Sequence, residues 1–170
     1  GPDPVLLSET PPGKALLSFL EVIESDYSRE SVMRWLSESP ISPSSGGLDS
    51  SAQVAVWDVA SRNSGVLRGL DQWAERLERY GAALSSRIEI SDPLDETSPA
   101  KLRGLRQMRS AAGGLASFVA GLGQNRPPSD DASWAAFANW AQDVLRRYAP
   151  KPDEWREQDQ ASMDQIMDLL

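Results

Sequence analysis

Two amphipathic segments joined by a short polar turn occupy residues 11–41, and they constrain the fold more than any other part of the sequence. In the first segment, large apolar residues recur every three or four positions, the spacing of one face of an α-helix. Thr10 and Pro11 are typical of a helix start, because a hydroxyl caps the first turn and proline needs no N–H there. The predicted apolar face consists of Leu16, Leu17, Leu20 and Ile23, with Phe19 and Val22 beside them.

A second, shorter helix is predicted from Ser28 to a position before Pro40, since the residue preceding a proline disfavours helical geometry. Its apolar face consists of Val32, Trp35 and Leu36. The connection through Asp26 and Tyr27 is short, and two helices joined in this way pack side by side in opposite directions. Residues 11–41 are therefore predicted to form an αα-hairpin.

Helical periodicity continues through the rest of the chain. Further helices are predicted over about residues 52–62, 70–86 and 99–121, from Asp131 to a position before Pro150, and from Asp153 to the C-terminus. Arg87–Ile90 is the only hint of a strand. The predicted fold class is all-α, an irregular bundle of about six or seven helices built on the N-terminal hairpin. Residues 1–170 are expected to form a single domain.

Tryptophans and a pair of glycines are the other features of these helices that bear on packing. Trp35, Trp73, Trp134 and Trp140 lie on or beside apolar stripes, so we predict core positions for them rather than base stacking; Trp57 and Trp155 are not assigned. Gly113-Gly114 lies inside a predicted helix, where each glycine costs about 1 kcal/mol relative to alanine. Such a pair is tolerated where another helix approaches closely, and otherwise marks a kink.

Composition excludes several classes of chemistry. The 170 residues contain no cysteine and no histidine, which removes disulfides, thiol nucleophiles and the commonest transition-metal ligands. The absence of cysteine fits a reducing compartment, and a cytoplasmic location is expected. No apolar run approaches the ~18 residues that a membrane-spanning helix needs, so no membrane partner is expected. Gly1-Pro2 is typical of a protease remnant and Leu170 falls inside a helical pattern, so we expect a piece of a longer protein, truncated at its C-terminus.

Short motifs between about residues 8 and 80 carry a family resemblance. They are TPPGKALL (10–17), ESDYSRE (24–30), WD (57–58), GVLRGLDQW (65–73) and RL (76–77), with Leu36 and Ser39-Pro40 between them. They resemble the accessory 2B-type helical region of UvrD/Rep-like superfamily 1 DNA helicases, and most of all the AddB-type helicase-nuclease subunits of bacterial recombination. The matching residues pack and cap helices, so the resemblance supports homology rather than a particular chemistry.

The resemblance implies a non-catalytic module inserted into the second motor domain of an ATP-dependent helicase or helicase-nuclease of DNA repair or recombination. Such modules pack beside the motor and help to engage duplex DNA or to regulate unwinding. The motor domains of the parent protein and DNA are the expected partners. ATP and Mg²⁺ would bind to the motor domains, so this fragment is expected to hold no cofactor and to be no enzyme.

The residues themselves give no sign of a catalytic site. Pro12–Ala15 looks like the end of a phosphate-binding loop, but the motif needs glycine where Ser8 stands and Ser or Thr where Ala15 stands. Asp95-Glu96 follows no buried strand, so it is no Walker B site, and Asp130-Asp131 is interpreted as a helix cap rather than a metal pair. A nuclease of the PD-(D/E)xK type needs an acid-x-lysine setting, which the lysines at 14, 101 and 151 lack. A stand-alone enzyme is therefore disfavoured.

One basic segment stands in an acidic chain. The net charge is −8, yet residues 99–126 contain five basic residues and no acid. The candidate nucleic-acid-binding residues in this segment are Lys101, Arg103, Arg106 and Arg109. On a helix the three arginines descend one side, where they can meet successive phosphates. Two alternatives stay open: a solvated basic face paired with acids of other helices, and a protein-interaction domain without nucleic-acid contact whose acidic surface meets a basic partner.

Overall fold

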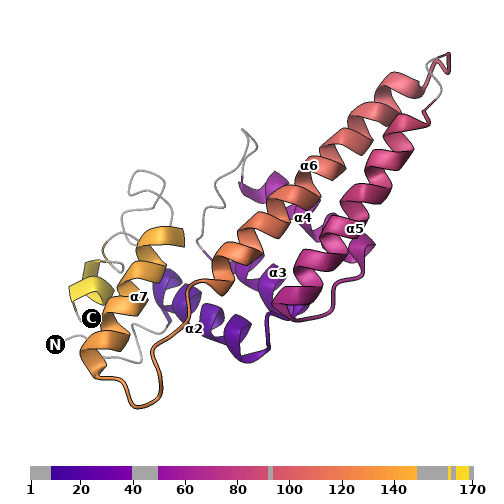
Figure 1. Ribbon diagram of the computed structural model, residues 1–170. Coiled ribbons are helices and arrows are strands. Elements are labelled where there is room, and N and C mark those ends of the chain that lie inside the picture. The colour runs from indigo at the N-terminus through magenta and orange to yellow at the C-terminus, as the bar shows by residue number, and fades with distance from the viewer. Residues whose placement is uncertain (1–8, 40–49, 92–93, 149–160, 162–163, 169–170) are drawn as a thin grey trace. The chain divides into compact units, whose positions relative to one another are not determined.

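The computed structural model describes residues 9–39, 50–91, 94–148, 161 and 164–168 (Figure 1). All regular secondary structure in these ranges is α-helix, which confirms the all-α prediction. Contacts group the chain into two compact units, residues 1–44 with 124–170 and residues 45–123. A single domain over residues 1–170 stays a prediction, and each unit is described by itself.

The first unit contains the predicted αα-hairpin, formed by α2 (Pro11–Glu24) and α3 (Arg29–Glu38). Thr10 Oγ1 accepts a hydrogen bond from Gly13 N–H at 3.3 Å, and Ser28 Oγ accepts one from Ser31 N–H at 3.1 Å, so a side chain caps each helix. Asp26 and Tyr27 make the turn with φ values of 56° and 54°. The Tyr27 N–H donates to Val22 O at 2.8 Å, which closes the turn.

The buried face of α2 differs from the predicted one. Ala15, Phe19 and Val22 are buried, whereas Leu17 is 48% exposed and the other predicted residues, Leu16, Leu20 and Ile23, are only partly buried. The ring of Phe19 lies 5.1 Å from Trp35 of α3 and 6.0 Å from Tyr148, so the helices that pack on α2 approach the Phe19 side. Their position, rather than the hydropathy of α2 alone, decides which side is buried.

Helix α7 (Trp134–Tyr148) completes the described core of this unit. It begins three residues later than predicted, because Ser133 rather than Asp131 is the cap: Ser133 Oγ accepts from Ala136 N–H at 3.1 Å. The core prediction for Trp134 is wrong, since its side chain is 68% exposed. Residues 164–168 are helical as well, and Ile166 packs against Leu145. The predicted start of this last helix and Trp155 lie outside the described residues.

The second unit consists of α4 (Ser50–Ser64), α5 (Leu70–Glu89) and α6 (Ser98–Gly123). Helices α5 and α6 lie side by side as a long hairpin, with α4 packed on part of it (Figure 1). The hint of a strand at Arg87–Ile90 is wrong, because α5 continues to Glu89. Positive φ values at Gly65 and Gly69, 75° and 85°, shape the loop between α4 and α5.

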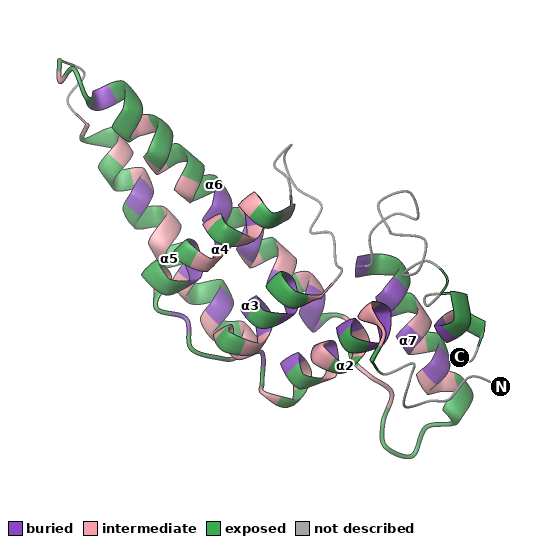
Figure 2. Ribbon diagram, turned by 180° about the vertical axis from the view of Figure 1, so that it is seen from behind, coloured by how far each residue is buried: buried purple, intermediate pink, exposed green. Residues whose placement is uncertain are grey.

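Burial along the hairpin changes with distance from α4. Where α4 packs, the ring centroids of Trp57 and Phe118 are 5.1 Å apart. Both helices of the hairpin bury apolar side chains there. Beyond α4, Leu102, Leu105 and Met108 of α6 are only half-buried, because α5 alone covers them (Figure 2). We call this outer half of the hairpin, residues 84–91 and 94–110, the distal arm.

The glycine pair of α6 lies where α4 approaches. A Cβ atom on Gly114 would stand 3.7 Å from Trp57 Nε1, an ordinary van der Waals contact. At Gly114, therefore, α6 is packed against α4. Gly113 faces solvent, with no atom within 4 Å of its Cβ position. A Cβ atom on Gly123, at the end of α6, would stand 2.5 Å from Leu70 Cδ1, which is too close.

These environments predict opposite effects of the same substitution. Gly113→Ala should raise the free energy of unfolding by up to about 1 kcal/mol, because alanine favours the helix and meets no neighbour. Gly123→Ala should lower it by about 1–3 kcal/mol, because the partly buried Leu70 side chain must move. Urea unfolding followed by circular dichroism measures both; equal effects of the two variants would contradict the described packing around α6.

Candidate nucleic-acid interface

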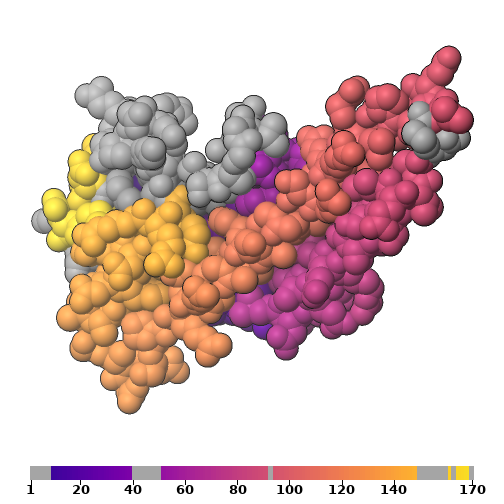
Figure 3. All heavy atoms as spheres, turned by 45° about the horizontal axis from the view of Figure 1, so that its top comes forward, coloured from indigo at the N-terminus to yellow at the C-terminus, as the bar shows by residue number. Residues whose placement is uncertain are grey.

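The candidate basic residues lie on the distal arm. Arg103, Arg106 and Arg109 are exposed on α6, with the small or polar residues Gly104, Gln107 and Ser110 exposed between them. Successive arginines are three residues apart, so they are offset by roughly 60° around the helix and about 4.5 Å along it. They therefore share one side of α6, which we call the arginine row. In the space-filling view α6 runs along the visible face beside α5 (Figure 3).

Lys101 lies outside the arginine row. It stands about 160° from Arg103 around the axis, and its Nζ lies 3.3 Å from Asp95 Oδ2 at the start of α6. The pair is exposed, so solvent screens it and it adds little to stability. Of the four predicted residues, Arg103, Arg106 and Arg109 thus lie together, whereas the Lys101 side chain lies at Asp95 near the end of the arm.

Among the described residues, no acidic side chain pairs with the arginine row. Arg109 Nη1 donates to Ser85 Oγ of α5 at 3.4 Å, a neutral hydroxyl. Arg103 and Arg106 form no ion pair or hydrogen bond with any residue that the structure describes. Of the alternative interpretation, the described residues show the solvated basic face at these two positions but not its pairing with acids of other helices.

Three exposed arginines on other helices are paired within their own helix, whereas exposed Arg68 and Arg87 form no ion pair with a described residue. Arg34, Arg62 and Arg79 each form an ion pair with an acid four residues earlier: Glu30, Asp58 and Glu75 respectively. Pairs at this spacing stabilise a helix by about 0.2–0.5 kcal/mol. The positions four residues before Arg103, Arg106 and Arg109 are proline, leucine and leucine, so the arginine row lacks this device.

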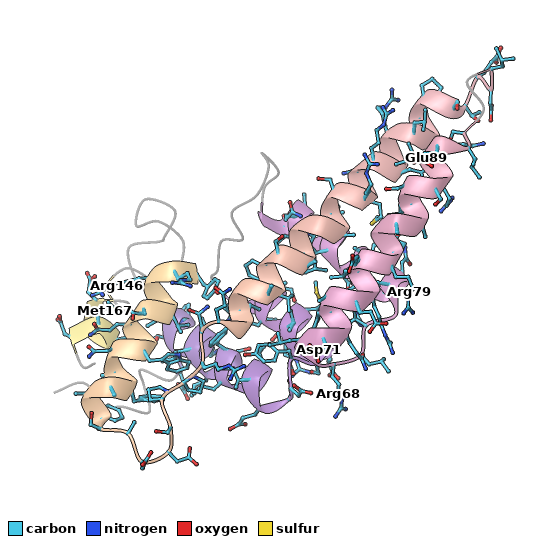
Figure 4. The ribbon with its side chains drawn as sticks, in the orientation of Figure 1. Arg68, Asp71, Arg79, Glu89, Arg146 and Met167 are labelled. Carbon is cyan, nitrogen blue, oxygen red and sulfur yellow. The ribbon has the colours of Figure 1, made fainter. Side chains whose placement is uncertain are left out.

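Acidic groups bound the row at the tip of the arm. Glu89 ends α5, and Asp95 and Glu96 precede α6 (Figure 4 labels Glu89). Arg87, also exposed, adds one positive charge on α5. The outward side of α6 is therefore locally positive, while the tip is locally negative.

Asp95 organises the start of α6. Its Oδ1 accepts hydrogen bonds from Thr97 N–H at 2.9 Å and Thr97 Oγ1–H at 2.8 Å, and its backbone O accepts from Ser98 N–H at 2.9 Å. The hydrogen bonds from the Thr97 backbone and side chain, and then the one from Lys101, lower the pKa of the Asp95 carboxyl below its ordinary 3.8. The ionised carboxylate thus holds the first turn of α6 in place.

The basic segment recognised in the sequence is divided between the two units. Arg126 belongs to the first unit. Its charge acts there on Tyr27. Burial raises the pKa of the Tyr27 hydroxyl above its ordinary value, and the Arg126 charge offsets part of this rise. Only the part of residues 99–126 that forms α6 contributes to the arginine row.

The remaining candidate motifs take structural positions. Pro12–Ala15 forms the first turn of α2, and its one glycine N–H, at Gly13, is occupied by the Thr10 cap. Within the described ranges, no three acidic side chains gather closely enough to hold a metal ion. None of the helices described here combines the length and apolar character that crossing a bilayer requires.

Comparisons with models of known protein families, with curated proteins and with solved structures gave no match. The likeness to helicase accessory regions therefore stays a prediction based on the motifs of residues 8–80. Sequence reasoning missed two features of the surface: the exposure of Trp134 and that of Ile90 and Leu94 at the arm tip. Periodicity gives no signal for either, because exposure at a helix end depends on where the partner helices stop.

The lowered pKa of Asp95 predicts a pH-dependent stability. Its folded pKa lies below 3.8, so the carboxylate stabilises the arm above that pH and loses its effect as the pH falls through the folded value. Asp95→Ala should lower the urea midpoint at pH 7, and the gap to the wild type should narrow below about pH 4. Glu96→Ala, which removes a neighbouring exposed carboxylate, is the control. A gap that stays constant with pH would contradict the assignment.

Proposed function

We propose that this chain is a non-catalytic accessory module of an ATP-dependent DNA helicase or helicase-nuclease, and that the arginine row contacts the phosphate backbone of DNA. Two kinds of support are independent of each other. The motifs of residues 8–80 resemble the 2B-type region of such helicases, and the row lies on α6, outside those motifs. In this proposal the motor domains of the parent protein supply ATP hydrolysis and Mg²⁺ binding.

The observation that carries the proposal is that no acidic side chain in the described part of the chain pairs with the row. Like charges three residues apart on one helix side repel one another, and nothing on α6 offsets them. A surface selected only for stability would carry the glutamate–arginine pairs that α3 and α5 carry. Exposed and unpaired guanidinium groups are suited to phosphate oxygens, because their planar N–H donors match that geometry.

The chemistry of the row predicts binding without sequence preference. Phosphate contacts position a protein on DNA but carry no base information. No exposed aromatic side chain of the described arm stands beside the arginines for base stacking. The module is therefore proposed to hold the backbone while the motor moves the strand, and its affinity should depend steeply on salt.

Salt dependence and charge reversal test the proposal together. Three phosphate contacts give a slope of about −2.7 in log affinity against log salt, so the affinity for a fluorescein-labelled 20-base-pair duplex should fall about 40-fold between 50 and 200 mM NaCl. Arg103→Glu combined with Arg106→Glu and Arg109→Glu should abolish this binding at 50 mM NaCl. Fluorescence anisotropy measures both effects, and a single strand of 20 nucleotides compares the two DNA forms.

The matched control separates a local site from the overall charge. Lys14→Glu with Arg34→Glu and Arg146→Glu changes the net charge equally, but all three residues lie in the other unit. This variant should keep most of the affinity. Equal losses in both triple variants, or wild-type binding that ignores salt, would refute the proposed DNA contact.

A second candidate function is a protein-interaction domain without nucleic-acid contact, and the tip of the arm favours it. Ile90 and Leu94 are 82% and 89% exposed there, beside the acids Glu89 and Glu96. Such a tip fits a partner with apolar and basic groups rather than DNA. Under this alternative, replacing Ile90 and Leu94 by serine would impair assembly with the parent protein, while the charge reversals of the row would have no effect.

A further inference from the structure

Trp134 is an exposed tryptophan at the start of α7, in the first unit. The stripe that continues from it along α7 is buried at Ala138, Ala141 and Tyr148. The rings of α2 and α3 that meet this stripe contact Trp140 and Tyr148, farther along the helix. Trp134 thus extends the core stripe past the end of its covering helices, and its indole remains 68% exposed.

The exposed ring is held in place by a chain of aromatic contacts. Its centroid lies 5.8 Å from that of Phe137 with an interplanar angle of 28°, and the Phe137 ring lies 5.5 Å from Trp140. Trp140 Nε1–H donates to Asn125 O at 3.3 Å, which fixes the inner end of the chain. A ligand that stacks on the free side of Trp134 therefore orders no mobile ring, and this lowers the entropic cost of binding.

Two acidic residues lie shortly before Trp134 in the sequence. Asp130 and Asp131 are exposed in a turn that the 2.9 Å hydrogen bond from Ala132 N–H to Ser129 O closes, three and four residues before Trp134. A hydrogen bond from Ser129 lowers the pKa of the Asp131 carboxyl, so the group is ionised at neutral pH. Among the described residues no cationic side chain lies on the indole.

We propose that Trp134, with Asp130 and Asp131, binds an arginine side chain of an extended basic protein segment. Tryptophan offers the strongest ring for a cation, and the flat guanidinium stacks on its face. The two carboxylates balance the charge of the bound arginine. Because the same carboxylates repel phosphate, a nucleic acid is not the expected occupant. The inference does not rest on the proposed DNA contact, since the arginine row belongs to the other unit.

A defined peptide pair tests this site on the whole 170-residue chain. The probe is a fluorescein-labelled hexapeptide of alternating glycine and arginine; its partner carries citrulline, which has nearly the shape of arginine without its charge. The wild type should bind the arginine peptide about two- to fivefold more tightly than Trp134→Ala does. The affinity of Trp134→Phe for the arginine peptide should lie between those of the wild type and Trp134→Ala. The citrulline peptide should bind the wild type and Trp134→Ala equally.

Two matched controls separate the site from general properties of the surface. Leu67→Ala removes an apolar side chain of nearly equal exposure, 67%, in the other unit, and should leave binding unchanged. Asp130→Asn with Asp131→Asn should weaken binding, whereas Asp71→Asn with Glu78→Gln, an equal change of charge elsewhere, should not. The proposal is overturned if Trp134→Ala binds like the wild type, or if both pairs of acid substitutions weaken binding equally.

Discussion

The packing of α6 against helices shorter than itself is the constraint on which the second unit depends. Helix α6 has 26 residues, α5 has 20 and α4 has 15. At 1.5 Å per residue, α4 covers at most about 22 Å of a helix about 39 Å long. The inward apolar side chains of α6 are consequently buried at Ala111, Ala112, Leu115, Val119 and Leu122, whereas Leu102, Leu105 and Met108 are only half-buried. The arginine row falls in the half that has a single neighbouring helix, so its guanidinium groups stay in solvent.

Charge is arranged along this helix in a way that costs stability. The row combines like charges with no acid on α6 to offset them, and the lysine near it is drawn to Asp95. The arm also lacks the third helix that buries apolar side chains elsewhere in the unit. Helices of this length depend mainly on tertiary packing, so both features place the distal arm at the less stable end of the unit.

The sequence predicted which segments are helical, and it failed where burial depends on partners. Residue spacing located α2 to α7 within a few residues, because amphipathic periodicity is a local property of the chain. The side of α2 that is buried is set by Trp35 and Tyr148, which come from distant positions in the sequence. Periodicity placed Leu16 on the predicted apolar face and Phe19 beside it, and the positions of α3 and α7 reverse that order of burial.

The candidate sites show the same limit. The arginine row could be predicted, because three-residue spacing on a helix and the missing acids four positions earlier are both visible in the sequence. The exposure of Trp134 could not, since its stripe is continuous with the core residues of α7 and differs only in lying past the covering helices. Lys101 was grouped with the arginines by proximity in sequence, although its Nζ lies at Asp95 rather than along the row.

A polyanion on the arginine row would change the balance described for the arm. The repulsion among Arg103, Arg106 and Arg109 is largest when the arm is folded, because only the helix holds them within about 9 Å of axial length. Phosphates between them would replace repulsion by attraction, so a ligand that binds the folded row would stabilise the arm by mass action. Gly104, which meets no neighbour, lowers the helix propensity of the unliganded arm further. Binding at the row and order in the arm are therefore two aspects of one equilibrium.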